Sequence, residues 1–355
     1  MHLQINESQI LKRLDENGLK YKFLELQNGI FVIISERGGH IFGPFLEKGG
    51  NSLLWMNPVF ADEIGFKQFV AENHWNMGGD RNWIAPEIQY ITLNRSDPNK
   101  VSISTKMDPG AYILEKSNPS EFFLHQDMTL VARNVAMGEK KLHIETHIRP
   151  TEDPMRYLKA YPSLIENIRF IGYEQTVKLS EYKTDGIMSE LWNFAQLNPE
   201  GEILVPISPA FEITNYTTQP IDPAHYKYDK NLLRIKIDGT YMYKIGLKAA
   251  HFTGRLGYLA KSDSKTSYLL IRNFFNNPSS YYIEEPAWSV GQWGDSVHIY
   301  NDGGKWGGFG ELEVHGQTIG GVTGKSESVD LIQMWIYIGE PDKLQSIAEN
   351  LLGIE

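Results

Sequence analysis

The chain has 355 residues, and its 34 lysines and arginines against 44 aspartates and glutamates give a formal charge of −10. This acidic balance lacks the positive field that attracts phosphate backbones, so we do not expect a nucleic-acid partner. Cysteine is absent, which excludes disulfides and thiolate metal sites and is typical of a reducing compartment.

The first residues show no targeting segment. Residues 1–7 lack the basic stretch followed by an apolar stretch that marks a signal peptide. No apolar run approaches the roughly 20 residues that span a bilayer. We therefore expect a cytoplasmic protein with no membrane partner.

Helical periodicity is predicted only at the two ends of the chain. A short amphipathic helix is predicted over 7–17, with Gly18 ending it, and a second over 341–352. Between them, a hairpin turn is predicted at Gln27-Asn28-Gly29. Strand-like segments are predicted at 21–26, 30–34, 101–107, 122–131, 141–148, 168–179, 232–237, 241–247, 268–274 and 329–338.

These segments favour an all-β fold. Strands far outnumber helices, and the interleaved helices of a parallel sheet are missing. We expect a large antiparallel two-layer β-sandwich that forms a single domain over 1–355. The sandwich core would span 20–340, with the helices at 7–17 and 341–352 lying at its periphery.

The most informative stretch is the predicted strand at 310–315. Alternation places Glu311, Glu313 and His315 on one face and Leu312 and Val314 on the other. Neighbours on the polar face would stand about 6.6 Å apart, so a small polar molecule could touch two of them. The alternative is a strand with one solvated face.

A second polar and aromatic cluster covers residues 73–87. The fork of Arg81 could hold a hydroxyl pair or a carboxylate, and the Trp83 ring could stack on a sugar. The alternative is a structural Arg–Asp network that braces a long loop. A third such segment, 191–196, is more typical of packing.

Metal and nucleotide motifs are not supported. His143 and His147 fall on a predicted strand, about 13 Å apart, which is too far to share one zinc ion. The glycines of 38–43 are followed by no helix and no P-loop lysine. We therefore predict no metal and no cofactor.

Several short motifs, in this order, resemble one family. The segments Gly38-Gly39-His40-Ile41-Phe42-Gly43, Asn51-Ser52-Leu53-Leu54-Trp55, Met77-Gly78-Gly79-Asp80-Arg81-Asn82-Trp83, Trp192-Asn193-Phe194, Tyr243-Lys244-Ile245-Gly246, Gly257-Tyr258-Leu259 and Glu311-Leu312-Glu313 carry the resemblance. The chain is similar to the galactose mutarotase-like superfamily, which includes aldose 1-epimerases and hexose-6-phosphate mutarotases. The likeness covers roughly residues 20–340.

The resemblance implies a sugar site on the concave face of a β-sandwich. In the family a late glutamate takes the anomeric hydroxyl proton, and Glu313 matches its position. The family's acid, a histidine, does not carry over, because Met77 and the segment 191–193 stand in its places. His74, His251 and His315 are substitute acids, since each lies near a matched segment.

Three functions follow as hypotheses. The first is an aldose 1-epimerase-like isomerase that acts on a small-molecule carbohydrate, with Glu313, His315 and His74 as catalytic candidates. Its predicted substrate-binding residues are Arg81, Asp80, Trp83, Trp192, Asn193, His251 and Glu311. The second is a carbohydrate-binding sandwich without catalysis, and the third is a glycosidase or lyase that uses Glu311 and Glu313. Nothing in the sequence predicts the oligomeric state.

Overall fold

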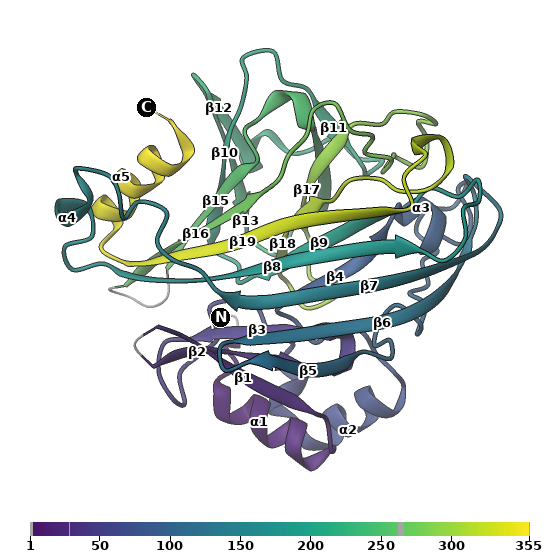
Figure 1. Ribbon diagram of the computed structural model, residues 1–355. Helices are drawn as coiled ribbons and strands as arrows, with labels where there is room; N and C mark the ends of the chain where they lie inside the picture. Colours follow the sequence, from purple (N-terminus) through teal and green to yellow (C-terminus); the bar gives the residue numbers. More distant parts are fainter. Residues whose placement is uncertain (1–2, 28, 262–265, 355) are drawn as a thin grey trace.

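Two large antiparallel sheets form the body of the protein, as the sequence predicts (Figure 1). The computed structural model describes residues 3–27, 29–261 and 266–354. The nine-stranded sheet has the order β1 (Tyr21–Gln27), β2 (Ile30–Ser35), β3 (Ile41–Phe45), β4 (Asp80–Ala85), β9 (Glu190–Leu197), β18 (Gly310–His315), β17 (Asp295–Asn301), β14 (Tyr243–Lys248) and β11 (Ile213–Asn215).

The second sheet has ten strands, and its longest strands are longer than those of the first sheet. Its order is β12 (Tyr226–Asp229), β13 (Leu232–Ile237), β10 (Gly201–Pro206), β15 (Arg255–Lys261), β16 (Ser267–Phe274), β19 (Glu327–Gly339), β8 (Arg169–Glu181), β7 (Gly138–Pro150), β6 (Glu121–Ala132) and β5 (Ile113–Asn118). In Figure 1 the long strands β6, β7, β8 and β19 cross the front of the molecule.

The two sheets bury a common apolar core between them. Leu312 and Val314 of β18 share one hydrophobic cluster with Leu270 of β16 and Ile336 of β19. Successive side chains of a strand point to opposite faces, so this burial turns the residues on either side of Leu312 and Val314 to the other face of the nine-stranded sheet. That outer face carries the candidate site.

Helices cover parts of the outer faces. Asn6 caps α1 (Glu7–Glu16) by accepting from the Gln9 backbone, and α1 packs with α2 (Glu63–Ala71) in a cluster that includes Ile33 of β2 and Phe42 of β3. At the other end, Pro341 begins α5 (Pro341–Leu352), which packs on the outer face of β16 and β19. Both predicted terminal helices are present, at the lower edge and on the left of Figure 1.

Two local predictions are wrong. Residues 101–107 form turns and a single bridge rather than a strand, because the Ser104 carbonyl accepts from the backbones of Met107 and Asp108. Helices are also not confined to the two ends of the chain. Asp62 caps α2, and two further short helices, α3 (Glu87–Tyr90) and α4 (Tyr161–Leu164), follow.

Other boundaries agree closely with the predictions. Strands β1 and β2 pair antiparallel as the hairpin signal predicts, although Asn28 of the turn lies outside the described residues. Within the described part of the chain, no helix is long and apolar enough to cross a membrane.

Candidate functional site

A cavity of about 260 Å³ lies against the outer face of the nine-stranded sheet. Its floor comes from β4, β9, β14, β17 and β18, which are neighbours in the sheet, and α3 and several loops form its sides. The aromatic part of its wall includes Trp75, Trp83, Trp192, Phe194, Trp306 and Phe309. Such flat apolar surfaces with a few polar groups are typical of a small-molecule site.

Strand alternation decides which side chains reach the site. On β18, Glu311, Glu313 and His315 point to the outer face, as predicted from the sequence, and all three are buried. Glu311 lines the cavity, whereas Glu313 and His315 lie beside it under other side chains. The polar face of this strand is therefore not a solvated one.

Lys244 of β14 links the cavity wall to the buried Glu313. Its Nζ lies 2.8 Å from Glu87 Oε2 and 3.2 Å from Glu313 Oε2. The ammonium also stands 4.5 Å from the centre of the Trp192 ring, within the range of a cation–π contact. Lys244 thus holds two carboxylates and one aromatic wall residue in fixed positions.

Glu311 has a separate set of contacts. The side-chain amide of Gln196 donates to Glu311 Oε1 at 2.9 Å, and Arg81 Nη1 donates to Gln196 Oε1 at 3.2 Å. Gln196 therefore connects Arg81 to the carboxyl group on the cavity wall. Arg81 itself is fully buried and packs its guanidinium on Trp75, Trp83 and Phe194.

Burial shifts the protonation of the acidic side chains. Burial, and then the charge of Glu313, raises the pKa of Glu311 to about 8. Burial also raises the pKa of Glu313, although Lys244 opposes this shift, and it raises the pKa of Glu284 well above its ordinary value. For Lys244, burial disfavours the charged form, but Glu313 and Glu87 outweigh burial and raise its pKa.

The two neighbouring carboxyls therefore meet different surroundings. Burial raises the pKa of both, but only Glu313 faces an ammonium, that of Lys244, which opposes the shift. Pairs of titratable groups whose environments differ in this way are typical of acid and base sites.

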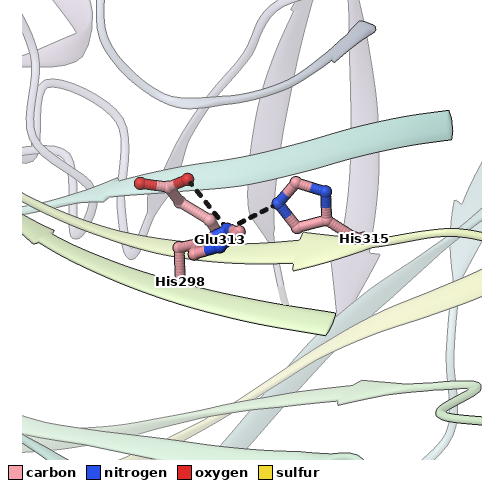
Figure 2. A group of neighbouring side chains, drawn as sticks. All are labelled: His298, Glu313 and His315. Atoms are coloured by element: carbon pink, nitrogen blue, oxygen red, sulfur yellow. Dashed lines mark hydrogen bonds and ion pairs between the residues drawn. The ribbon is translucent and has the colours of Figure 1, made fainter. Parts of the chain in front are cut away.

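A chain of buried polar side chains runs behind the cavity wall. His315 Nδ1 lies 3.0 Å from Glu190 Oε1 of β9, and His315 Nε2 lies 2.7 Å from His298 Nδ1 of β17. His298 Nδ1 is in turn 3.9 Å from Glu313 Oε2 (Figure 2). Burial, and then the charges of His315 and Lys244, lowers the pKa of His298 well below its ordinary value.

Two predicted substrate-binding residues lie on the opposite face of the nine-stranded sheet. Asp80 and Asn193 point between the sheets, where Arg272 of β16 donates to both of them. Tyr173 also donates to Asp80, at 2.7 Å. The structure thus separates Asp80 and Asn193 from the cavity, although they are adjacent in sequence to Arg81 and Trp192.

The two remaining histidine candidates also lie outside the cavity lining. His74 stacks on Phe69 and accepts from the Asn76 backbone. His251 follows β14 and accepts from the Glu212 backbone. Of the residues predicted from the sequence, Trp83, Trp192 and Glu311 line the cavity. Arg81, Glu313 and His315 are buried next to these lining residues and do not line the cavity themselves.

Sequence reasoning missed several residues of the site: Glu87, Glu190, Lys244, Glu284 and His298. For His298 a signal was present, because Ser296, His298 and Tyr300 alternate with Val297 and Ile299 as in a strand. Nothing local in the sequence indicates that Glu87 and Glu284 meet, since Glu284 accepts a backbone hydrogen bond from Glu87 across 197 positions.

Comparisons with known proteins support the fold. The model of a family of unknown function, DUF6786, matches residues 21–355, whereas no curated protein matches the chain. Among solved structures, a candidate aldose 1-epimerase from Escherichia coli K12 is 11% identical over 90% of this chain and 99% of that chain, with a TM-score of 0.53. A galactose mutarotase-like protein from Lactobacillus casei ATCC 334 is 10% identical over 90% and 99% of the two chains, with a TM-score of 0.47.

At such low identity, the first of these likenesses establishes the fold alone. The chain has a divergent form of the galactose mutarotase-like fold, which confirms the prediction from the sequence motifs.

Proposed function

Because the chain belongs to the DUF6786 family, whose function is unknown, we propose a function from the site itself: an isomerase of the aldose 1-epimerase type. The observation that carries the proposal is a buried carboxyl, Glu311, on the wall of an aromatic cavity that also contains the Lys244–Glu87 ion pair; burial raises the pKa of Glu311 to about 8. A sugar in this cavity would meet a proton donor and a carboxylate at once.

The size and lining of the cavity support a small saccharide. Its volume of about 260 Å³ lies just below the roughly 300–1,000 Å³ of sites for drug-sized ligands, which suits a single sugar ring better than a polymer. The flat faces of Trp83, Trp192 and Trp306 match the apolar faces of a pyranose, and the carboxyls match its hydroxyls.

The proposed mechanism is proton exchange at the anomeric centre. Glu87, paired with Lys244, takes the proton of the anomeric hydroxyl, while Glu311 gives its proton to the ring oxygen. The bond between the anomeric carbon and the ring oxygen breaks, and the aldehyde rotates and closes on its other face with both protons returned. Such acid and base steps contribute about 10²–10⁴-fold each.

The role of Glu313 in this proposal differs from the one expected from sequence. Its carboxylate oxygens are enclosed and lie beside Lys244, whereas Glu311 borders the cavity. We therefore assign to Glu313 the positioning of Lys244 and the maintenance of the Glu311 proton, and we assign the transfer itself to Glu311.

Exchange between anomers, measured by NMR at the anomeric proton, tests the proposal. The panel would hold neutral aldoses, amino sugars, uronic acids and hexose 6-phosphates, each corrected for the uncatalysed rate. We expect exchange for at least one sugar, and Glu311→Gln should lower kcat/KM by about 100-fold or more. Glu174→Gln is the matched control, since Glu174 is similarly buried but lies on β8 of the other sheet.

A carbohydrate-binding protein without catalysis is the second candidate. It is favoured by one observation: Met77, where the family has a histidine, is packed in the apolar cluster with Phe42 and Phe60. Perturbed sugar resonances without any anomeric exchange above buffer would favour binding alone and refute the isomerase.

A further inference from the structure

We propose that His298, Glu313 and His315 form a zinc site directly behind the cavity wall. Each of the three offers one ligand atom, and these atoms all lie within 4.8 Å of one another. Figure 2 shows the His298 ring of β17 between the Glu313 carboxylate and the His315 ring of β18, with both dashed contacts meeting at the His298 nitrogen. This inference does not depend on the isomerase proposal, because it concerns metal binding alone.

Sheet register explains why the three side chains meet. His298 of β17 is the direct partner of Glu313 in β18, and His315 follows two residues later on the same face. All three are almost completely enclosed, so the ligand atoms are held by packing rather than by mobile surface chains. Ligands held on packed strands need only small shifts to reach the geometry of a metal site.

Glu190 orients one of the proposed ligands. The Glu190 carboxylate accepts from the Thr318 hydroxyl and the Ile283 backbone, and lies 3.0 Å from His315 Nδ1. With Nδ1 of His315 facing this carboxylate, its Nε2 is the ring nitrogen directed at the site. A carboxylate behind a histidine in this way is the usual outer partner of a zinc ligand.

Unpaired atoms indicate that the cluster lacks a partner. Among the described residues, neither oxygen of the buried Glu313 has a hydrogen bond, and only Oε2 has an ion pair, with Lys244. Buried polar atoms are normally satisfied, so the unbonded oxygens of Glu313 suggest a missing ligand.

The local charge also favours a cation. Glu190 and Glu313 are both buried in this region, and the ammonium in contact with Glu313 is that of Lys244, which Glu87 shares. Burying carboxylates without compensation is costly. A divalent ion at Glu313 would add positive charge that the shared Lys244 does not supply.

Two imidazoles and one carboxylate suit zinc. Zn²⁺ binds such sets with three protein ligands and leaves a fourth position for water. Zinc–nitrogen bonds of roughly 2.0–2.1 Å put tetrahedral ligand atoms about 3.3 Å apart. The 2.7 Å separation of the two ring nitrogens would have to open, and the 3.9 Å between His298 Nδ1 and Glu313 Oε2 would have to close. For His298 Nδ1 to bind the ion, the neutral ring would carry its hydrogen on Nε2.

Titration of the metal-stripped, untagged protein with ZnCl₂ in a calorimeter tests the site. We expect one zinc per chain. His298→Gln, His315→Gln and Glu313→Gln should each weaken binding by more than about 100-fold, and Glu190→Gln by roughly 10–100-fold. His225→Gln is the matched control, because His225 is also buried beside a carboxylate but lies outside the cluster; its variant should bind zinc normally.

Two outcomes would overturn the proposal: no uptake of zinc by the folded wild type, or unchanged binding in the three ligand variants. Loss of binding in His143→Gln instead would place the ion on the exposed face of β7, where His143 contacts Asp127 and Glu145.

Binding of Co²⁺ to the wild type tests the site without any variant, so the test remains valid if a ligand variant fails to fold. The wild type loaded with Co²⁺ should show the intense visible bands of a tetrahedral site, and only weak octahedral bands would refute it. Both measurements are made without sugar, so absence of isomerase activity would leave the zinc result standing.

Discussion

Glu311 and Glu313 illustrate how one neighbour sets the chemistry of another. Both carboxyls are buried on one face of β18, but Glu313 is paired with Lys244 and Glu311 is bonded to the neutral amide of Gln196. The charge of Glu313 contributes, after burial, to the raised pKa of Glu311. Glu311 is thereby kept protonated near neutral pH without any change to its own side chain.

Replacing Glu313 by Gln should move the pH dependence of activity. If protonated Glu311 is the acid, kcat/KM of the wild type should fall as pH rises through about 8. Glu313→Gln removes a negative neighbour, so the pKa of Glu311 falls and the loss of activity should begin at lower pH. A pH profile of anomeric exchange measures this shift, and an unchanged alkaline limb would refute the coupling.

The Glu311 carboxyl can also be followed without activity. Its titration by carbon NMR should give a midpoint near 8 in the wild type and a lower one in Glu313→Gln. A raised folded pKa also means that Glu311 favours the folded state at low pH and loses this contribution as pH rises through about 8.

At the scale of elements, β4 presents functional side chains on both faces of its sheet. Asp80 and Asn82 point between the sheets, where Asn82 donates to Thr146 and Gln175, whereas Arg81 and Trp83 point to the cavity side. Residues adjacent in sequence therefore have different roles. Asp80 belongs to the buried ion pair with Arg272, which joins the two sheets.

Arg272→Met should destabilise the protein without directly altering the cavity. It leaves Asp80 buried and uncompensated, which costs about 3–5 kcal/mol. Arg149→Met, which breaks the pair between the exposed Arg149 and Glu174, should cost about 1 kcal/mol or less. Urea unfolding measures both, and the double variant Asp80→Asn with Arg272→Met should lose less stability than Arg272→Met alone. Equal losses for Arg272→Met and Arg149→Met would contradict this account.

The alternation of polar and apolar residues along the sequence made the strands and the polar face of β18 predictable. The alternation of Glu311, Glu313 and His315 with Leu312 and Val314 depends only on local sequence. The partners of these side chains do not, because Lys244 and Glu190 come from strands β14 and β9, which only the folded sheet brings close to β18. The missed α2 has a weak local signal, since its helical face packs in a tertiary cluster that the sequence does not display.

At the scale of the whole molecule, we propose that residues 1–355 form a single domain. The core between the sheets contains residues from near the start of the chain, such as Leu24 of β1, and from near its end, such as Ile338 of β19. A core built from both ends of a chain favours cooperative unfolding.

Unfolding by urea should therefore be one transition. Far-ultraviolet circular dichroism, which reports the strands, and near-ultraviolet circular dichroism, which reports the packed aromatic rings, should give the same midpoint. Two separated transitions would contradict the single domain.

The aromatic wall of the cavity has an optical consequence. Of the 8 tryptophans of the chain, Trp75, Trp83, Trp192, Trp288 and Trp306 all line the cavity. Most of the tryptophans of the protein therefore surround the place where a ligand would displace water. Because Lys244 lies over the Trp192 ring, movement of a single charge would also alter the emission. Tryptophan emission can therefore be used to screen ligands of the cavity without an activity assay.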